Sequence, residues 1–180
     1  ISAGDDVLNV DGVDIVTASD SSVRANIGGD LAGFTADIEF DVVDDANALV
    51  AELTSSGFGP GGLDEANTVV VSDGDVTASE ADAIQAISGY DGSASDYDIT
   101  DTAAALISAG DDVLNVDGVD VVTVDDGPVL ADTGEALAEL SKDVEFDVLD
   151  TADNVAAEVT GSNGAGDLDE ANTVVVREGH

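Results

Sequence analysis

The chain has 180 residues, of which 41 are Asp or Glu and only three are Lys or Arg, giving a formal net charge of −38 at pH 7. Such a charge repels nucleic acid and anionic membranes and attracts cations. With 43% hydrophobic residues, the chain is too apolar for a disordered acidic tail and is expected to fold. It has no Cys or Met, which excludes disulfides and thiol sites, and no apolar run approaches the roughly 20 residues of a membrane span.

The excess of carboxylates is consistent with two explanations, a solvated acidic surface or bound divalent ions. Two carboxylates about 5 Å apart repel by roughly 0.8 kcal/mol in water and roughly 3 kcal/mol at an effective dielectric constant of 20. Because only Arg24, Lys142 and Arg177 carry positive charge, few counter-charges come from the chain itself. This scarcity of Lys and Arg favours the second explanation, in which cations from the surroundings offset the repulsion between carboxylates.

The chain is built from repeats. The first segment, ISAGDDVLNVDGVDIVTASD (residues 1–20), returns almost unchanged at residues 107–126, and LDEANTVVV returns about 105 residues after its first occurrence. The large repeat is therefore about 106 residues long, and a weaker half-repeat lies within it. This pattern divides the chain into residues 1–21 (the end of a half-repeat), 22–75 (half-repeat B), 76–127 (half-repeat A) and 128–180 (half-repeat B, second copy).

Helix signals occur at residues 78–87 and 131–140, with a divergent, Gly-broken counterpart at residues 26–34. Ser79 is the expected start of the first, and its apolar set is Ala83, Ile84 and Ile87. The β-branched runs at 68–71, 119–124 and 173–176 favour parallel strands buried on both faces. Gly-rich loops at 57–62 and 161–166 are expected at corners.

A third signature is an aromatic residue, then Asp, a β-branched residue and a second Asp that opens an Ala-rich run. Tyr97 to Thr100 alternates as a half-buried strand does, and Asp101 is expected to cap the helix that follows. Asp44 and Asp150 occupy the same cap position. The aromatic residues of the three signatures are expected in the core: Phe40, Tyr97 and Phe146.

The half-repeat is therefore predicted as helix, strand, short helix, strand, which belongs to the α/β class. Elements this short bury their apolar faces only by stacking, so the predicted fold is an elongated repeat solenoid of short parallel strands and short helices. The alternative is a row of tandem β-sandwich domains.

The stretch GDDVLNVDGVD at residues 4–14 returns at 110–120 and is rich in hard oxygen ligands. It is not an EF-hand, because aligning Gly12 with the loop glycine places Val7 and Ala18 at the first and last ligand positions. A looser calcium site is one hypothesis, and turns and caps made by Asp and Asn are the other. The predicted metal ligands are Asp5, Asp6, Asn9, Asp11 and Asp14, with Asp111, Asp112, Asn115, Asp117 and Asp120 in the second copy.

The half-repeat alignment also predicts two ladders of polar residues along one edge of the fold. Such a ladder either faces water, where its repulsion is screened, or collects cations. The first consists of Asp11, Asp64, Asp117 and Asp169, and the second of Asp14, Asn67, Asp120 and Asn172.

The motifs YDITDTAAAL (residues 97–106) and FDVLDTADNV (146–155) resemble the repeat regions of giant secreted bacterial surface proteins. These include adhesin-, haemagglutinin- and hemolysin-type calcium-binding proteins and S-layer-associated proteins. AGDDVLNVDG is similar to part of their calcium-binding nonapeptide GGxGxDxLx at Gly4, Asp6 and Leu8, without the paired Gly or a tandem copy. The resemblance implies an extracellular structural or adhesive role, often with calcium, and supplies no catalytic residue.

Catalysis is not expected, because His180 is the only histidine and neither a Ser-His-Asp triad nor a His metal site can be built. The predicted function is a structural segment of an extracellular bacterial repeat protein, an acidic rod or filament on the cell surface or in the matrix, stabilised by calcium. Its expected partners are neighbouring copies or adjoining repeats and calcium, with no nucleic acid and no membrane insertion. The alternatives are a calcium-dependent adhesion module, which binds a surface, glycan or partner protein, and a fragment of a halophilic secreted enzyme.

Overall fold

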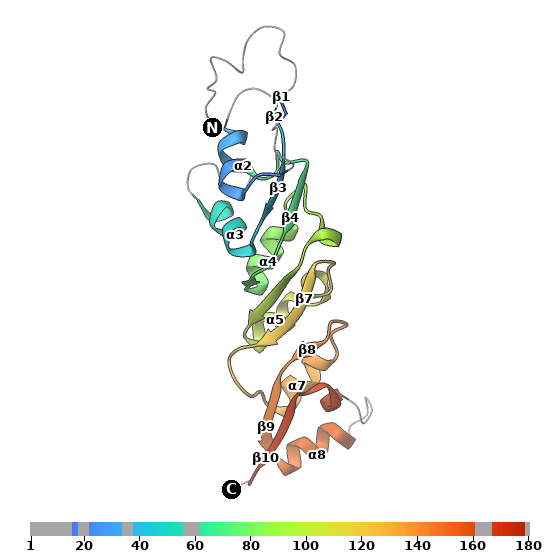
Figure 1. Ribbon diagram of the computed structural model, residues 1–180. Coiled ribbons are helices and arrows are strands. Elements are labelled where there is room, and N and C mark those ends of the chain that lie inside the picture. The colour runs from blue at the N-terminus through green and yellow to red at the C-terminus, as the bar shows by residue number, and fades with distance from the viewer. Residues whose placement is uncertain (1–15, 18–21, 34–37, 56–61, 161–166, 179–180) are drawn as a thin grey trace.

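The computed structural model describes residues 16–17, 22–33, 38–55, 62–160 and 167–178, which form a mixed α/β structure (Figure 1). The helices are α2 (Ala25–Ala32), α3 (Ala46–Thr54), α4 (Ala78–Gln85), α5 (Ala103–Ala109), α6 (Asp111–Leu114), α7 (Ala131–Ala138) and α8 (Ala152–Thr160), with 3-10 helices η2 (Gly92–Ala94) and η3 (Asp167–Glu170). The strands are β1 (Val16–Thr17), β2 (Ile38–Glu39), β3 (Asp41–Asp44), β4 (Thr68–Val71), β5 (Asp75–Val76), β6 (Tyr97–Asp101), β7 (Val119–Val124), β8 (Val144–Glu145), β9 (Asp147–Thr151) and β10 (Thr173–Arg177). None of the described helices is long and apolar enough to cross a membrane.

All strand pairings in the described part of the chain are parallel. β1 pairs with β2, β3 with β4 and β9 with β10, while β5, β6, β7 and β8 form a four-stranded sheet in that order. Three isolated parallel bridges add pairings outside the strands, at Val23 with Val42, Val69 with Tyr90 and Val129 with Val148. A β-sandwich is made of antiparallel sheets, so the alternative of tandem sandwich domains is wrong.

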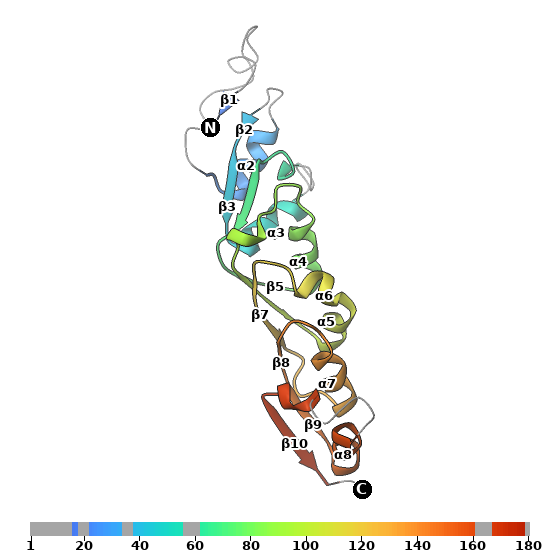
Figure 2. The same cartoon turned by 90° about the vertical axis from the view of Figure 1, so that its right-hand side faces the viewer.

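The elements follow one another in chain order along an elongated molecule, with the strands on one side and the helices on the other (Figures 1 and 2). We call a strand segment and the helix that follows it a unit. The units are Val23 with α2, β2 and β3 with α3, β4 and β5 with α4, β6 with α5, β7 with α7, and β8 and β9 with α8. In each of the first five units, the strand segment pairs in parallel with that of the next unit, as β3 does with β4.

The helices α4 and α7 begin where the predicted helix signals begin, at Ala78 and Ala131, but the capping residue of α4 differs from the prediction. The N-cap of α4 is Thr77, not Ser79, and it forms a capping box with Glu80: the Thr77 N–H donates to Glu80 Oε2 (2.9 Å) and the Glu80 N–H to Thr77 Oγ1 (3.4 Å). Its buried face carries Ala81 and Ile84, whereas Ala83 is exposed. The sequence places this cap too late because Ser, Thr and Glu recur around it.

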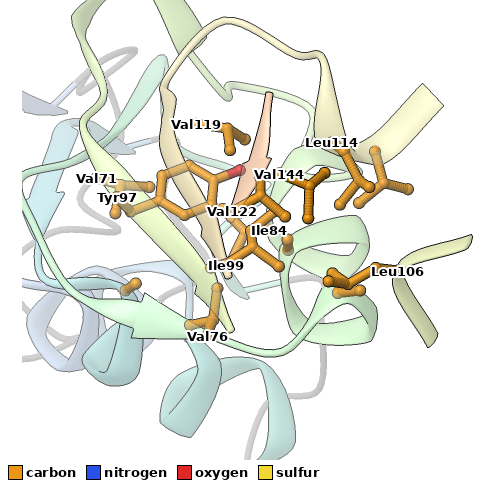
Figure 3. Close-up of a cluster of buried hydrophobic side chains, with 14 of the residues drawn as sticks. Val71, Val76, Ile84, Tyr97, Ile99, Leu106, Leu114, Val119, Val122 and Val144 are labelled. Atoms are coloured by element: carbon orange, nitrogen blue, oxygen red, sulfur yellow. The ribbon is translucent and has the colours of Figure 1, made fainter. Parts of the chain in front are cut away.

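A single cluster of buried side chains runs through the described units. Phe40, Tyr97 and Phe146 are all buried within it, as expected. Around Tyr97 the cluster combines side chains from several units, including Val71, Ile84 and Val122 (Figure 3). The Tyr97 hydroxyl is not left unpaired, because Gln85 Nε2 donates to it over 2.8 Å and also to the Val113 carbonyl over 3.0 Å.

The predicted strands are present, but the prediction that they are buried on both faces is wrong. β4 alternates half-buried and buried residues, and every residue of β10 is exposed. The helices lie along one side of the strands, so the other face of each strand meets solvent (Figure 2). The predicted Gly-rich corner loops lie outside the described residues apart from Gly62.

The same contacts recur one large repeat apart. The Asn67 N–H donates to the Phe40 carbonyl over 2.9 Å, and the Asn172 N–H donates to the Phe146 carbonyl over 2.8 Å. The bridge between Val23 and Val42 likewise has its counterpart between Val129 and Val148. Similar sequence therefore forms the same local structure in both copies of half-repeat B.

Candidate functional site

Four carboxylates join successive units at the helix N-termini. Each accepts a hydrogen bond from the backbone N–H of the first residue of the preceding helix, across 19 to 23 residues of chain. We call them the cross-unit carboxylates. The bonds are Ala25 N to Asp44 Oδ2 (3.0 Å), Ala78 N to Asp101 Oδ2 (3.1 Å), Ala103 N to Asp126 Oδ1 (3.2 Å) and Ala131 N to Asp150 Oδ2 (3.2 Å).

These bonds follow from the parallel pairing. Each strand ends where its own helix is about to begin, so a residue at the end of one strand lies beside the start of the helix before it. The first N–H groups of a helix have no partner within the helix, and the positive end of its dipole favours an anion. A carboxylate satisfies both requirements, and hydrogen bonds to ionised groups are stronger than neutral ones.

Three of these carboxylates, Asp44, Asp101 and Asp150, lie where the sequence predicts a cap of the following helix, yet each also accepts from the first N–H of the helix before it. Asp44 and Asp101 were expected to cap their own helices, but the N-caps of α3 and α5 are the next residues, Asp45 and Thr102. Asp101 Oδ1 does accept from the Thr102 N–H (2.8 Å), while its other oxygen reaches back to α4. The sequence marks these carboxylates by a three-residue pattern, an Asp followed by Asp or Thr and then Ala. The pattern does not indicate whether the first Asp accepts from the following helix or from the preceding one.

Asp44 and Asp150, one large repeat apart, are the most buried of the four, with 6% and 2% of their surfaces exposed. Arg24 Nη1 donates to Asp44 Oδ1 over 3.1 Å, and Arg177 Nη2 lies 4.0 Å from Asp150 Oδ1. Two of the three cationic side chains in the sequence are thus placed at equivalent buried carboxylates.

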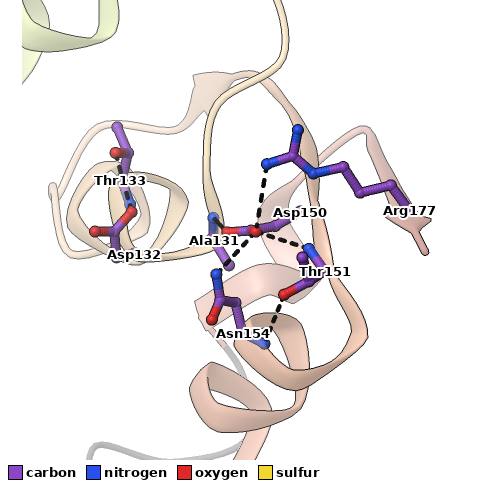
Figure 4. A network of polar contacts seen from close by, with 7 residues as sticks. All are labelled: Ala131, Asp132, Thr133, Asp150, Thr151, Asn154 and Arg177. Carbon is purple, nitrogen blue, oxygen red and sulfur yellow. Dashed lines mark hydrogen bonds and ion pairs between the residues drawn. The ribbon is translucent and has the colours of Figure 1, made fainter. Parts of the chain in front are cut away.

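The Asp150 network is drawn in Figure 4. Asp150 Oδ1 accepts from the Thr151 N–H (2.7 Å) and from Asn154 Nδ2 (2.9 Å). The N–H groups of Thr151 and then Ala131 hold the pKa of Asp150 below its ordinary value of 3.8, against the opposing effect of burial. Because the folded pKa is lowered, this carboxylate contributes stability above about pH 4, which is lost as the pH falls toward the lowered pKa.

At the start of α3 the same junction is made without a carboxylate. The Ala46 N–H donates to the backbone carbonyl of Asp73 over 2.8 Å. The contact between the first helical N–H and the next unit therefore follows from the strand geometry. Its acceptor is either an Asp side chain or a backbone carbonyl.

Two further carboxylates join units near the C-terminal ends of α4 and α7. Asp64 Oδ1 accepts from the Ser88 N–H over 3.0 Å. Asp111 accepts from Ser141 twice, at Oδ1 from the N–H (2.8 Å) and at Oδ2 from Oγ (2.7 Å). The Ser141 hydroxyl, and then its N–H, lower the pKa of Asp111.

The structure distributes the predicted calcium ligands of the second copy over different local positions. Asp111 and Asp112 lie in the first turn of α6, Asn115 follows its end, and Asp117 and Asp120 are exposed. In the described part of the chain, no three His, Cys, Asp or Glu side chains form a group suited to a metal ion. The first-copy ligands Asp5, Asp6, Asn9, Asp11 and Asp14 lie outside the described residues.

The described members of the two predicted ladders are all exposed, namely Asp64, Asp117, Asp169, Asn67, Asp120 and Asn172. Asp117 also has a structural contact, because its carbonyl accepts from the Tyr90 hydroxyl over 2.9 Å. Partial burial, the largest cause, raises the pKa of Tyr90. The Tyr90 hydroxyl is thus directed to the next unit.

An open groove of about 560 Å³ lies between α5 and α7. It is lined mainly by apolar groups, including Ile107, Pro128 and Leu130, with Asp126 at one side.

No protein-family model, curated protein or solved structure matches the chain. The candidate sites are therefore the junctions between units and the apolar groove beside them.

Proposed function

We propose that the chain is a structural segment of an extracellular repeat protein, a stiff acidic rod with the fold of an α/β repeat solenoid. The observation that carries the proposal is the recurrence of the cross-unit carboxylates at Asp44, Asp101, Asp126 and Asp150. A hydrogen bond of the same type recurs along the molecule and joins neighbouring units, as expected of a structural repeat. Each of these carboxylates has an oxygen that accepts a hydrogen bond within the fold. The proposal assigns no catalytic role.

The junctions support stiffness because they tie each unit to its neighbour at more than one point. Between β6 and β7, for example, the strands pair directly, while Asp126 holds the start of α5. Bending the rod there separates strands on one side or breaks the helix-end bond on the other. Repeat proteins of this kind gain their stability from nearest-neighbour interfaces.

The charge supports an extracellular, cation-rich setting. A net charge of −38 on a narrow molecule produces strong self-repulsion unless cations screen it. Calcium is the proposed cation, and the ligands we propose are the Asp and Asn residues of the two GDDVLNVDGVD segments. The resemblance of the repeat motifs to secreted bacterial surface proteins points in the same direction.

Small-angle X-ray scattering of the purified chain tests the rod. We expect the distance distribution to be that of an extended rigid particle, unchanged over a range of salt concentrations at which the protein stays folded. The double variant Asp101→Ala and Asp126→Ala is expected to broaden the distribution by loosening neighbouring junctions, whereas the exposed pair Asp125→Ala and Asp143→Ala should not. A compact globule for the wild-type chain contradicts the proposal.

Thermal unfolding in calcium and in sodium chloride at matched ionic strength tests the ion. A single site at ten times its dissociation constant adds about 1.4 kcal/mol of stability. We expect Asp112→Asn with Asp117→Asn to remove part of the calcium-specific gain and the control pair Asp125→Asn with Asp143→Asn to keep it. Equal unfolding curves in the two salts refute calcium while leaving the rod intact.

The α5–α7 groove favours an adhesion module as the second candidate. Leu130 is 47% exposed at its edge, and together with Ile107 and Pro128 it forms an apolar lining on the surface of a very acidic protein. A glycan array probed with the wild-type chain, with and without calcium, tests it, with Leu130→Asp as the matched variant. Binding that Leu130→Asp abolishes supports adhesion through the groove, and the absence of binding in both conditions removes glycan adhesion.

A further inference from the structure

The last described strand and helix, β10 and α8, leave an apolar surface uncovered. Val174 and Val176 are 38% and 53% exposed, and Val159 of α8 is 45% exposed. α8 has no buried residue, and β10 has one strand neighbour, β9, among the described residues. We call this surface, formed by β10 and α8, the terminal face.

The first copy of the repeat contains the same surface with its cover in place. Val69 and Val71 of β4 correspond to Val174 and Val176 and are both fully buried. The backbone of β4 is bonded to the segment that follows it. The bonds are Val69 N to Gly89 O (2.7 Å), Asp91 N to Val69 O (2.9 Å), Asp96 N to Val71 O (2.9 Å) and Val71 N to Ser95 Oγ (3.0 Å).

The helix side is covered in the same way. α3, which corresponds to α8, buries Ala46 and Leu49 and packs against α4. The first N–H of α3 is held by the Asp73 carbonyl (2.8 Å), just before β5. Gly74 makes this approach possible, since it has a φ of +118° and a Cβ there would lie 3.1 Å from the Ala46 Cβ.

From this internal copy we infer that the terminal face binds a strand–helix–strand segment of the type of residues 73–101. A folded second copy is not the source, because its own residues 73–101 already lie between β4 and β7. The occupant must offer strand backbone to Val174 and Val176, and an apolar helix face of the kind that carries the buried Ala81 and Ile84 in α4. This inference rests on the proposed solenoid and specifies the unit that continues it.

The test extends the chain so that the repeat goes on. His180 is replaced by the sequence of residues 75–127, which is attached directly to Gly179. This join continues the repeat because Gly179 corresponds to Gly74, the residue before Asp75. Amide hydrogen exchange is then followed at Val174 and Val176. We expect both amides to exchange at least about tenfold more slowly in the extended chain, because they become bonded to a packed neighbour.

Two controls make the result specific. An extension of the same composition in scrambled order should leave the exchange of Val174 and Val176 unchanged. In the correct extension, Val176→Asp should abolish the protection, because it places a carboxylate in the new interface.

The outcomes separate this inference from the proposed function. If the correct extension gives no more protection than the scrambled one, the inference is overturned, and scattering of the original chain still decides whether it is a rod. If the original chain forms dimers in sedimentation that Val176→Asp dissociates, a second copy is the occupant, and the inference is overturned in favour of self-association.

Discussion

The segments β3–α3–β4 and β9–α8–β10 share a sequence pattern, yet their surroundings differ. The run TVVV is half-buried to fully buried in β4 and exposed along its whole length in β10. The buried residues Ala46 and Leu49 of α3 have exposed or half-buried counterparts in α8. The difference comes from the neighbouring elements, because β5, α4 and residues 89–96 cover the first of these segments.

This contrast shows that burial belongs to the interface between units. Fully burying a valine side chain stabilises a protein by about 1.5–3 kcal/mol relative to leaving it exposed. The same valine run therefore contributes much more in β4 than in β10. Mutations at equivalent positions of the two copies measure how much of the stability depends on the neighbour.

The largest difference is expected between Val71→Asp and Val176→Asp. Val71 is fully buried, so the new carboxylate has no water and no partner, and the unfolding free energy should fall by about 3–5 kcal/mol. Val176 is 53% exposed, and its substitution should change the unfolding free energy by about 0.5 kcal/mol or less. Urea denaturation of both variants checks this, and equal losses contradict the contrast.

The next largest effect concerns the two kinds of junction. Asp44→Ala leaves the buried N–H of Ala25 without its acceptor, which should cost about 2–3 kcal/mol. At the start of α3 the acceptor is the Asp73 carbonyl, so Asp73→Ala keeps the bond and should cost about 0.5 kcal/mol or less. Similar losses for both variants in denaturant titrations are incompatible with a junction made by the Asp44 side chain.

A third pair tests positions with equivalent Val and Phe neighbours in both copies, although a Cβ would lie 3.7 Å from Leu63 at Gly28 and 3.2 Å from Leu168 at Gly134. A Cβ at Gly28 would lie 3.0 Å from Val42 Cγ2, and one at Gly134 would lie 3.0 Å from Val148 Cγ2. Alanine gains helix propensity of about 1 kcal/mol but crowds the valine. The net effects of Gly28→Ala and Gly134→Ala on the unfolding free energy, measured by thermal melting, should agree within about 0.5 kcal/mol. A larger gap shows that the two copies differ here too.

The smallest effect is expected at Asp111. Its lowered pKa means that its bonds to Ser141 stabilise the fold above about pH 4 and are lost as the pH falls below that value. Ser141→Ala removes the hydroxyl donor and should raise the pKa of Asp111 toward 3.8, as followed by carboxyl NMR titration. Ser88→Ala is the control, because Asp64 accepts only from the Ser88 backbone N–H, and it should leave that bond in place.

Much of the local structure was predictable from the sequence. The helices α4 and α7 and the strand β6 follow from periodicity and capping residues, and the core positions of Phe40 and Phe146 follow from the repeat. The function of Asp44 and Asp150 was not predictable, because the pattern Asp, Asp or Thr, Ala describes a cap without stating whose helix it serves. Likewise, the hydrogen bond from Ser141 to Asp111, 30 residues away, could not be predicted from the spacing of the Asp and Asn residues around Asp111.

The sequence by itself determined the α/β class, the repeat and the element order, because these depend on residue spacing within short segments. Only the tertiary structure decided which strand is covered and which carboxylate joins which units. Both properties depend on residues that lie about one unit away in the sequence. Parallel strand pairing brings these residues into contact, and a short local sequence pattern does not specify such long-range contacts. Identical TVVV runs in β4 and β10, one buried and one exposed, are the direct result.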